Sequence, residues 1–455
     1  MSAPLLIETL TDGLPQPRRA WAFFALTLAM IMAVLDGAIV NIALPTISGD
    51  LGVTPANAIW VVNAYQLAIT VALLPLASLG DSLGYRRVYI VGLAIFTASS
   101  LACALAPSLP WLIVARVAQG FGAAGVMSVN IAIVRFIYPK AQLGLGVGNM
   151  AVVVASSSAA GPSVAAAVLS VASWHWLFFV NVPIGALALL VATRALPRTP
   201  RSGHRIDALS VALNAVTLAL LVTGIDRLGD PRGLTIAFAE LAGALVVGAV
   251  FVWRQLGLPQ PILPIDLLRR PVFALSLATS ITSFAAQSLA LIALPFYFEG
   301  ALRFSSATTG LLLTPWPVGI ALIAPIAGRL ADRFSPGKLG SIGLLVEACG
   351  LTLLALLPAD PRPLDIAWRL AICGVGFGFF QSPNNKLIIG SAPPHRSGGA
   401  AGLQSTGRLV GQSIGTAFMA VIFGRMFAGP TEIALWTAVG LSLFAALVGG
   451  LRRMD

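Results

Sequence analysis

Apolar stretches of about 20 residues recur along the whole chain, and short polar segments separate them. A helix needs about 20 apolar residues to cross the hydrocarbon core of a bilayer. The pattern predicts an all-α integral membrane protein with fourteen spans, at residues 21–43, 57–79, 88–106, 110–133, 144–169, 174–194, 206–225, 234–253, 272–297, 306–329, 338–357, 365–385, 399–424 and 431–451. Because fourteen is even, both termini are expected on one side of the membrane.

The first apolar stretch begins directly after Arg18 and Arg19, an arrangement also found in twin-arginine export signals. This stretch extends to about Ala43, which is longer than the apolar region of a signal, and no small-residue cleavage site follows it before the next span. We therefore interpret it as an uncleaved transmembrane helix, preceded by a cytosolic tail at residues 1–20.

The composition supports the membrane assignment and explains the basic charge. Only 10% of the residues are charged and the mean hydropathy is +0.90, whereas a soluble domain has about 25% charged residues. Of the 28 Lys and Arg residues, 20 lie in loops on the amino-terminal side and 5 in the opposite loops. The positive-inside rule then places both termini in the cytoplasm. We expect the protein itself in the cytoplasmic (inner) membrane. Topology thus explains the net charge of +11 without a nucleic-acid partner.

A long internal repeat divides the chain. Three landmarks recur in the same order at offsets of 251 to 254 residues: Asp81 as Asp332, Arg116 as Arg369, and the pair Gly148 and Gly161 as Gly402 and Gly415. The offset covers eight spans, so we predict two parallel six-helix bundles at residues 21–194 and 272–451, a linker with two additional helices at 195–271, and a cytosolic tail at 452–455. Parallel repeats are one architecture of secondary transporters, whose substrate site lies between the halves near mid-membrane.

Ionisable side chains inside apolar spans cost about 2.5–3.5 kcal/mol each on insertion scales and are therefore candidates for function. Asp36 and Arg116 both lie roughly 10 Å below the outer surface at 1.5 Å per residue, so they are suited to form a pair. If they face one cavity, proton binding to Asp36 releases the charge of Arg116, and a cationic substrate competes for the same carboxylate. The alternative is a static ion pair that only orients two helices.

Other polar and aromatic side chains within the spans are weaker candidates. Glu347 and Arg408 lie at similar depth and are a candidate pair, whereas Glu240 belongs to the additional helices and suits a packing role. Gly161 and Pro162 suit a bendable gate, although ordinary helix packing predicts the same residues. The substrate-binding candidates are Asn41, Gln119, Phe284, Gln287, Glu347 and Gln381.

Several classes of chemistry have no support in the sequence. No GxxxxGK[ST] phosphate loop is present, which argues against an ATP-driven pump unless a partner chain supplies the ATPase. The three cysteines lie in apolar stretches without metal-ligand spacing, and no nucleophile–base constellation occurs. We therefore expect no metal, no cofactor and no enzymatic activity.

Six segments resemble a known family, the fourteen-span drug:proton antiporters of the major facilitator superfamily. Residues 35–45 (LDGAIVNIALP) are similar to its first-helix motif, with Ala38 where Thr is usual, and residues 116–124 (RVAQGFGAA) match its fourth-span motif in full. Residues 79–87 (LGDSLGYRR) and 174–183 (WHWLFFVNVP) resemble its second loop and the start of its sixth span, and residues 328–333 (GRLADR) extend the resemblance to the second half. Gly161-Pro162 resembles the antiporter motif, with Ser157, Ala165 and Ala166 in place of glycines.

The resemblance implies alternating access and export in exchange for protons. Because the spans offer few dedicated polar groups beside a large apolar and aromatic surface, lipophilic, cationic compounds are the expected substrates. It implies proton coupling by Asp36 and Arg116, gating by Gly161 and Pro162, and a cytoplasmic latch formed by Asp81, Arg86, Arg87, Asp332 and Arg333. Ala77 and Ser82 depart from the loop motif, which weakens the inferred latch. The expected partners are a small-molecule substrate, protons and the lipid bilayer, with a monomer as the functional unit.

Three alternatives to a proton-driven multidrug exporter remain open at this point. One is an exporter dedicated to a single metabolite, antibiotic or lipid, which would show competition within one chemical class only. A passive channel would conduct downhill without proton dependence. A membrane sensor would need a soluble output domain, and the non-spanning segments are about 20 residues or shorter.

Overall fold

Helices form the regular structure of the chain in the computed structural model, which describes residues 13–139, 142–199, 207–229, 231–258, 265–358, 360–391, 397–425 and 429–452. Across these ranges no strand occurs. Residues 1–12 of the expected amino-terminal tail and residues 453–455 of the expected carboxy-terminal tail lie outside them, as do parts of the linker at 195–271.

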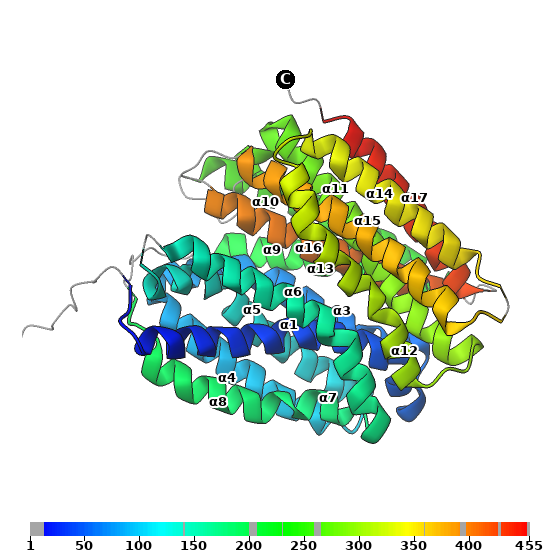
Figure 1. Cartoon of the computed structure of the whole chain (residues 1–455), viewed down its shortest axis with the longest axis horizontal. Coiled ribbons are helices and arrows are strands. Elements are labelled where there is room, and N and C mark those ends of the chain that lie inside the picture. Colours follow the sequence, from blue (N-terminus) through cyan, green and yellow to red (C-terminus); the bar gives the residue numbers. More distant parts are fainter. Residues whose placement is uncertain are drawn as a thin grey trace, which may run out of the picture.

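The first half of the chain forms one helical bundle, drawn from blue to green in Figure 1. Its main helices fall on the first six predicted spans, with short helices α2 and α7 leading into α3 and α8. The elements are α1 (Arg18–Asp50), α2 (Pro55–Ala58), α3 (Trp60–Leu83), α4 (Tyr85–Ala104), α5 (Leu109–Ile137), α6 (Leu143–Val171), α7 (His175–Phe179) and α8 (Asn181–Ala195).

The second half forms the other bundle, drawn from yellow-green to red. A π-helical turn, η4, extends α11, and the short α12 leads into α13. The elements are α11 (Pro271–Phe296), η4 (Tyr297–Ala301), α12 (Ser306–Leu313), α13 (Pro315–Leu330), α14 (Pro336–Ala355), α15 (Pro363–Gly390), α16 (Ser397–Gly424) and α17 (Pro430–Gly450).

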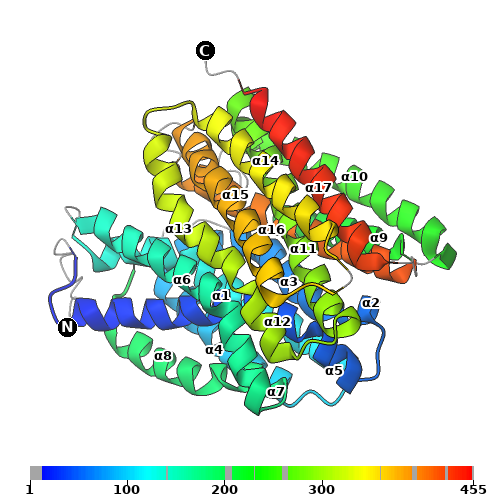
Figure 2. The same ribbon diagram turned by 45° about the vertical axis from the view of Figure 1, so that its right-hand side comes forward.

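Two further helices connect the bundles. They are α9 (Ala208–Arg227) and α10 (Leu234–Gly257), flanked by the 3₁₀ turns η2 (Pro231–Gly233) and η3 (Ile265–Arg269). Helix α9 packs against α3 and α16, whereas α10 packs mainly against α9 and lies at the edge of the molecule (Figure 2). The pair is thus attached to the outside of the two bundles.

The two bundles pack their helices in the same pattern. In the first bundle α1 contacts α6 and α8, α5 contacts α3 and α4, and α4 contacts α8. In the second bundle α11 contacts α16 and α17, α15 contacts α13 and α14, and α14 contacts α17. These pairs correspond helix by helix under the repeat offset read from the sequence.

Glycines allow the closest of these approaches. A Cβ added at Gly122 of α5 would lie 2.4 Å from the Phe96 backbone nitrogen of α4, and one added at Gly376 of α15 would lie 2.3 Å from the Glu347 backbone nitrogen of α14. Without a side chain the paired helices come into backbone contact, which is how helices associate in lipid. Close packing of α4 against α5 therefore explains why position 122 is a glycine.

Twelve helices in the described parts of the chain are long and apolar enough to cross a membrane. The bent helix α6 raises this number to thirteen. Helix α16 overlies the predicted span at 399–424 and is 28 residues long, but it is not among these helices. The structure therefore carries about 12–13 apolar spans and does not establish the predicted count of fourteen.

An apolar cluster joins the two bundles at one end. It combines residues from the carboxy-terminal part of α1, such as Ile42 and Ile47, with Leu312 and Trp316 of the second bundle. At the same end the hydroxyls of Thr46 in α1 and Ser306 in α12 lie 3.1 Å apart. The remaining large cores belong mostly to one bundle each. The halves are therefore held together most continuously at the end where α1 finishes.

Arg452 differs from the sequence prediction, which placed it in a solvated tail. It is only 6% exposed, and its Nη1 donates a 2.7 Å hydrogen bond to Oδ1 of Asn384 in α15. Burial lowers the pKa of the Arg452 guanidinium to about 10. The basic pattern of the tail predicted topology and gave no signal for this tertiary contact.

Candidate functional site

A buried ion pair forms the centre of the first bundle. Nη1 of Arg116 in α5 donates to Oδ2 of Asp36 in α1, and the two side chains are 1% and 0% exposed. The Nε of Arg116 donates to the carbonyl oxygen of Val61 in α3 at 2.9 Å. Three helices are thereby connected through one guanidinium.

Two amides complete the coordination of the carboxylate. Nε2 of Gln119 and Nδ2 of Asn181 donate to Oδ1 of Asp36 at 2.9 and 3.1 Å. Gln119 also accepts from Arg116 at 2.6 Å and donates to Oγ of Ser100 at 2.9 Å. A buried charge is costly unless it is paired and hydrogen-bonded, and this network supplies the Asp36 carboxylate with both an opposite charge and hydrogen-bond donors.

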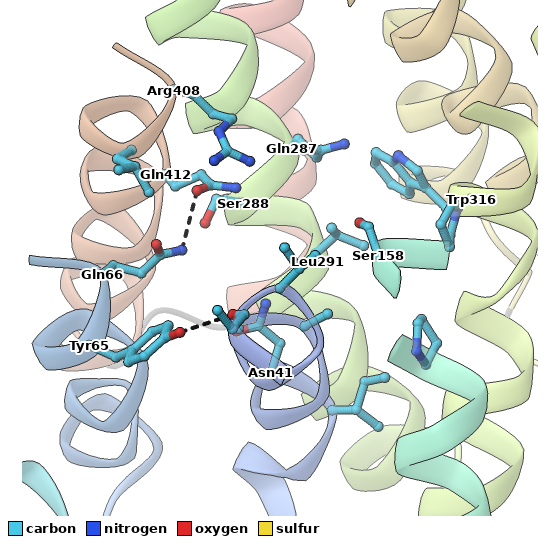
Figure 3. Close-up of a pocket in the computed structure, with 18 of the residues that line it drawn as sticks. Asn41, Tyr65, Gln66, Ser158, Gln287, Ser288, Leu291, Trp316, Arg408 and Gln412 are labelled. Carbon is cyan, nitrogen blue, oxygen red and sulfur yellow. Dashed lines mark hydrogen bonds between the residues drawn. The ribbon is translucent and has the colours of Figure 1, made fainter. Parts of the chain in front are cut away.

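A cavity of about 170 Å³ lies between the two bundles (Figure 3). Its walls come from α1, α3, α5 and α6 on one side and from α11, α12, α13 and α16 on the other. Apolar side chains make up much of the lining, and the polar side chains include Asn41, Gln66, Ser158, Gln287, Ser288, Arg408 and Gln412. The cavity thus occupies the position expected for a substrate site between two repeats.

Tyr65 separates this cavity from the ion pair. Its ring lines the cavity, and the Arg116 Cζ lies 4.0 Å from the centre of the same ring. The Tyr65 hydroxyl donates to the carbonyl oxygen of Ala33 at 3.0 Å, as Figure 3 shows. Neither Asp36 nor Arg116 is among the lining residues. The two charges therefore lie one aromatic ring away from the cavity.

Arg408 of α16 lies in the cavity instead of pairing with Glu347. Glu347 is 0% exposed in the core of the second bundle, where Oγ of Ser442 donates to its Oε2 at 3.4 Å. The predicted pair is therefore wrong, because equal depth in the membrane does not place two residues on facing sides of their helices. Within the described residues, Arg408 has no hydrogen bond or ion pair.

The remaining substrate-binding candidates divide into two groups. Asn41 and Gln287 line the cavity, and the Oδ1 of Asn41 has no hydrogen-bond partner among the described residues. Gln119 belongs to the ion-pair network, Phe284 packs against Phe377 with ring centres 5.1 Å apart, and Gln381 is not part of the lining.

Sequence reasoning missed the polar pair that crosses the cavity. Nε2 of Gln66 in α3 donates to Oε1 of Gln412 in α16 at 3.4 Å. Ser288 of α11, which also lines the cavity, lies within 3.1 Å of Thr416 in α16. The available signal was an uncharged amide inside an apolar helix, but such amides occur at many other positions of this chain.

Helix α6 contacts both bundles at Gly161 and Pro162. A Cβ added at Gly161 would lie 2.6 Å from the Ala38 Cβ of α1, and one added at Gly310 of α12 would lie 2.6 Å from the Pro162 carbonyl oxygen. The helix bends by 42° between residues 145–158 and 160–171. Proline removes one backbone hydrogen bond to the residue four positions earlier, which accounts for a bend at this place.

The predicted latch residues lie at helix ends. The Tyr85 hydroxyl donates to Oδ1 of Asp81, and Nη2 of Arg86 donates to the Thr193 carbonyl oxygen of α8 at 2.5 Å. In the second half Asp332 pairs with Lys386 of α15 at 2.5 Å, a partner that the sequence analysis did not name.

Two pseudo-equivalent helical bundles with a cavity between them define a secondary-transporter fold. The chain belongs to the Major Facilitator Superfamily, whose family model matches residues 26–416. It is therefore a multi-pass membrane transporter of small molecules, and this family is not a class of enzymes.

Three curated relatives agree with this assignment. The chain is 52% identical over 443 residues to an uncharacterised transporter, YebQ of Escherichia coli strain K12, and the match covers 97% of each chain. It is 30% identical to the riboflavin transporter RibZ of Clostridioides difficile, covering 88% of this chain and 87% of that protein. It is also 30% identical to the multidrug resistance protein Stp of Mycobacterium tuberculosis strain CDC 1551, covering 90% and 77% respectively.

A solved structure shows the same fold. The crystal structure of a bacterial homologue of the human lysosomal transporter Spinster, in an inward-facing and unoccupied conformation, aligns with a TM-score of 0.70 and 15% identity. The alignment covers 96% of this chain and 97% of that chain.

Proposed function

We propose that this protein is a proton-coupled antiporter that exports small lipophilic molecules by alternating access. The observation that carries the proposal is the buried Asp36–Arg116 pair, which lies beside the cavity and is separated from it by Tyr65. The subfamily suggested by the sequence, the fourteen-span drug:proton antiporters, is part of the same proposal, with both termini in the cytoplasm and a monomer as the functional unit.

Protonation of Asp36 is the proposed coupling step. A proton on this carboxyl cancels its charge and breaks the attraction to Arg116, which then keeps its own charge because a guanidinium does not deprotonate in proteins. An uncompensated buried arginine is unfavourable, so the helices α1, α3 and α5 that contact it are driven to rearrange. Release of the proton on the cytoplasmic side restores the pair.

Tyr65 connects this step to the substrate. Its ring touches both the cavity and Arg116, and its hydroxyl is tied to α1 through Ala33. A movement of the guanidinium therefore displaces a wall of the substrate cavity, and a bound substrate resists that displacement. Such a shared element is the physical requirement for coupling two sites.

The gating proposal concerns α6. Gly161 contacts α1 and Pro162 contacts α12, so the bend in α6 lies where the two bundles meet. A helix that already lacks one backbone hydrogen bond changes its bend at lower cost than an intact one.

The latch proposal keeps Asp81, Arg86, Arg87, Asp332 and Arg333 at the cytoplasmic ends of the helices and adds Lys386, which binds Asp332.

A narrower substrate range is the second candidate. At about 170 Å³ the cavity is smaller than the 300–1,000 Å³ typical of drug-sized ligand pockets, and one relative carries the name of a riboflavin transporter. An exporter dedicated to one chemical class would show mutual competition only within that class.

The experiment is transport in liposomes with an imposed pH gradient. Wild-type protein should move substrate uphill only when the gradient is present, and Asp36→Asn should lose this response while retaining substrate binding. Glu432→Gln is the matched control, because Glu432 is an exposed carboxylate at the start of α17 and should leave transport unchanged. Gradient-driven transport by Asp36→Asn at the wild-type rate would refute Asp36 as the coupling residue.

A further inference from the structure

The charge that the described residues place in the cavity is positive. Among the described lining residues Arg408 is the charged one, and none of them is Asp or Glu. The nearby carboxylates are engaged elsewhere: Asp36 is held by Arg116 and two amides, and Glu347 is buried in the second bundle with Ser442. A cationic substrate would therefore meet repulsion and find no counter-charge.

The guanidinium of Arg408 has donors to offer. It is directed toward the same part of the cavity as Gln412 and Ser288 (Figure 3), and within the described part of the chain it has no ion pair or hydrogen bond. A charged group inside an apolar span is costly, and a planar guanidinium binds carboxylate, sulfonate or phosphate groups through two parallel hydrogen bonds.

Two further side chains in the cavity lack partners. The Nε1 of Trp316 is a buried donor with no acceptor among the described residues, although the Trp316 side chain is only 1% exposed. The Oδ1 of Asn41 is an acceptor without a donor. Buried polar groups are normally hydrogen-bonded, so each of these atoms fits a ligand that supplies the missing partner.

The rest of the wall suits a ring system. Leu291, Leu313 and Ile320 contribute apolar surface beside the Trp316 indole, so a flat apolar body has both aliphatic and aromatic contacts available. A ligand that combines such a body with one anionic group would satisfy the charge, the unpaired donor and the apolar wall together.

We propose that the substrates are amphipathic organic anions, with Arg408 binding the anionic group and Trp316 contacting the apolar body. This inference rests on the proposed transport function and replaces the cationic substrates expected from the sequence. The proposed charge preference depends on one residue, because Arg408 alone sets the sign of the charge among the described lining residues.

Binding is measured first, without any gradient, by fluorescence polarisation of purified full-length protein in detergent at pH 8. The probes are carboxyfluorescein and rhodamine 123, which share a phenylxanthene body and carry opposite net charge. Wild-type protein should bind the anion at least tenfold more tightly than the cation. Equal binding, or preference for the cation, would overturn the proposal.

Three variants assign the effect to Arg408. Arg408→Gln should weaken anion binding by about 10- to 100-fold and leave the cation unaffected or better bound, since hydrogen bonds to charged groups have this magnitude. Arg408→Lys should restore part of the loss. Arg425→Gln is the control, because Arg425 is exposed just beyond the end of the same helix, where it donates to the Leu228 carbonyl oxygen. Unchanged anion binding in Arg408→Gln protein that elutes as a monodisperse peak would overturn the assignment.

Transport separates this inference from the function on which it rests. Uptake of carboxyfluorescein that depends on Arg408 but ignores a pH gradient would support the anion site and refute proton coupling. Gradient-driven transport of rhodamine 123 without anion binding would support proton coupling and refute the anion site.

Discussion

The strength of the Asp36–Arg116 pair gives the sharpest test of the buried site. Both side chains are almost completely buried, so the pair lies in a region of low polarisability. With about 4 Å between the charge centres and an effective dielectric constant of 20, the interaction is worth about 4 kcal/mol. A double-mutant cycle with Asp36→Asn and Arg116→Gln should therefore give a coupling free energy of about 3–4 kcal/mol.

The two single variants should not be equivalent. Asp36→Asn leaves the Arg116 guanidinium charged and unpaired in the core, which costs about 3–5 kcal/mol. Arg116→Gln leaves a carboxyl group that is able to take up a proton and become neutral, so its cost should be smaller. The double variant removes both charges and should be more stable than the sum of the single effects predicts.

The assay is equilibrium unfolding of purified protein by sodium dodecyl sulfate in mixed micelles, followed by circular dichroism. The matched control cycle uses Arg227→Gln and Glu240→Gln, because that ion pair joins α9 and α10 with side chains 48% and 18% exposed. Exposed pairs contribute about 0.2–1 kcal/mol. A coupling for Asp36 and Arg116 as small as in this control would show that water reaches the pair, and the argument from burial would fail.

Two smaller effects follow from local geometry. Gly161→Ala should destabilise the protein by about 1–3 kcal/mol and slow transport, because the new methyl group meets Ala38 at 2.6 Å. Gly148→Ala is the control, since its methyl group meets nothing within 4 Å and should stabilise the helix by about 0.5–1 kcal/mol. Unfolding curves that show equal effects of the two substitutions would contradict the close approach at Gly161. Asp207 caps α9 and binds Arg254, and the hydrogen bond from Arg254 lowers the pKa of Asp207 to about 2. The contribution of this carboxylate to stability is therefore present above its ordinary pKa near 4 and is lost as the pH falls through about 2. Asp207→Asn should be less stable than wild type at pH 6, and the difference should shrink as the pH is lowered toward 2, as measured by thermal unfolding.

The membrane architecture was predictable because its signals are local. Continuous apolar stretches, the distribution of Lys and Arg between loops, and the repeat offset each depend on residues close together or on simple counts. The helices overlie the predicted spans and the two bundles share one packing pattern. The number of membrane crossings was harder to predict, because α6 is bent and α16 carries Arg408 and two glutamines.

The candidate site shows where such reasoning stops. Depth in the membrane placed Asp36 beside Arg116, and the structure brings these two together. The same argument applied to Glu347 and Arg408 gave the wrong partner, because it contains no information on the direction in which each helix face points.

The amino-acid sequence alone was enough to show that this chain crosses a membrane many times, that its two halves repeat, and that a few charged side chains lie within its apolar spans. These properties follow from the cost of exposing polar groups to lipid, which acts on every residue independently of its partners. Which charge lies in the cavity became clear from the packed helices: their rotation and the docking of the bundles bury Asp36 behind Tyr65 and direct Arg408 inward. The sign of the charge that a substrate meets is thus a property of packing between helices distant in sequence.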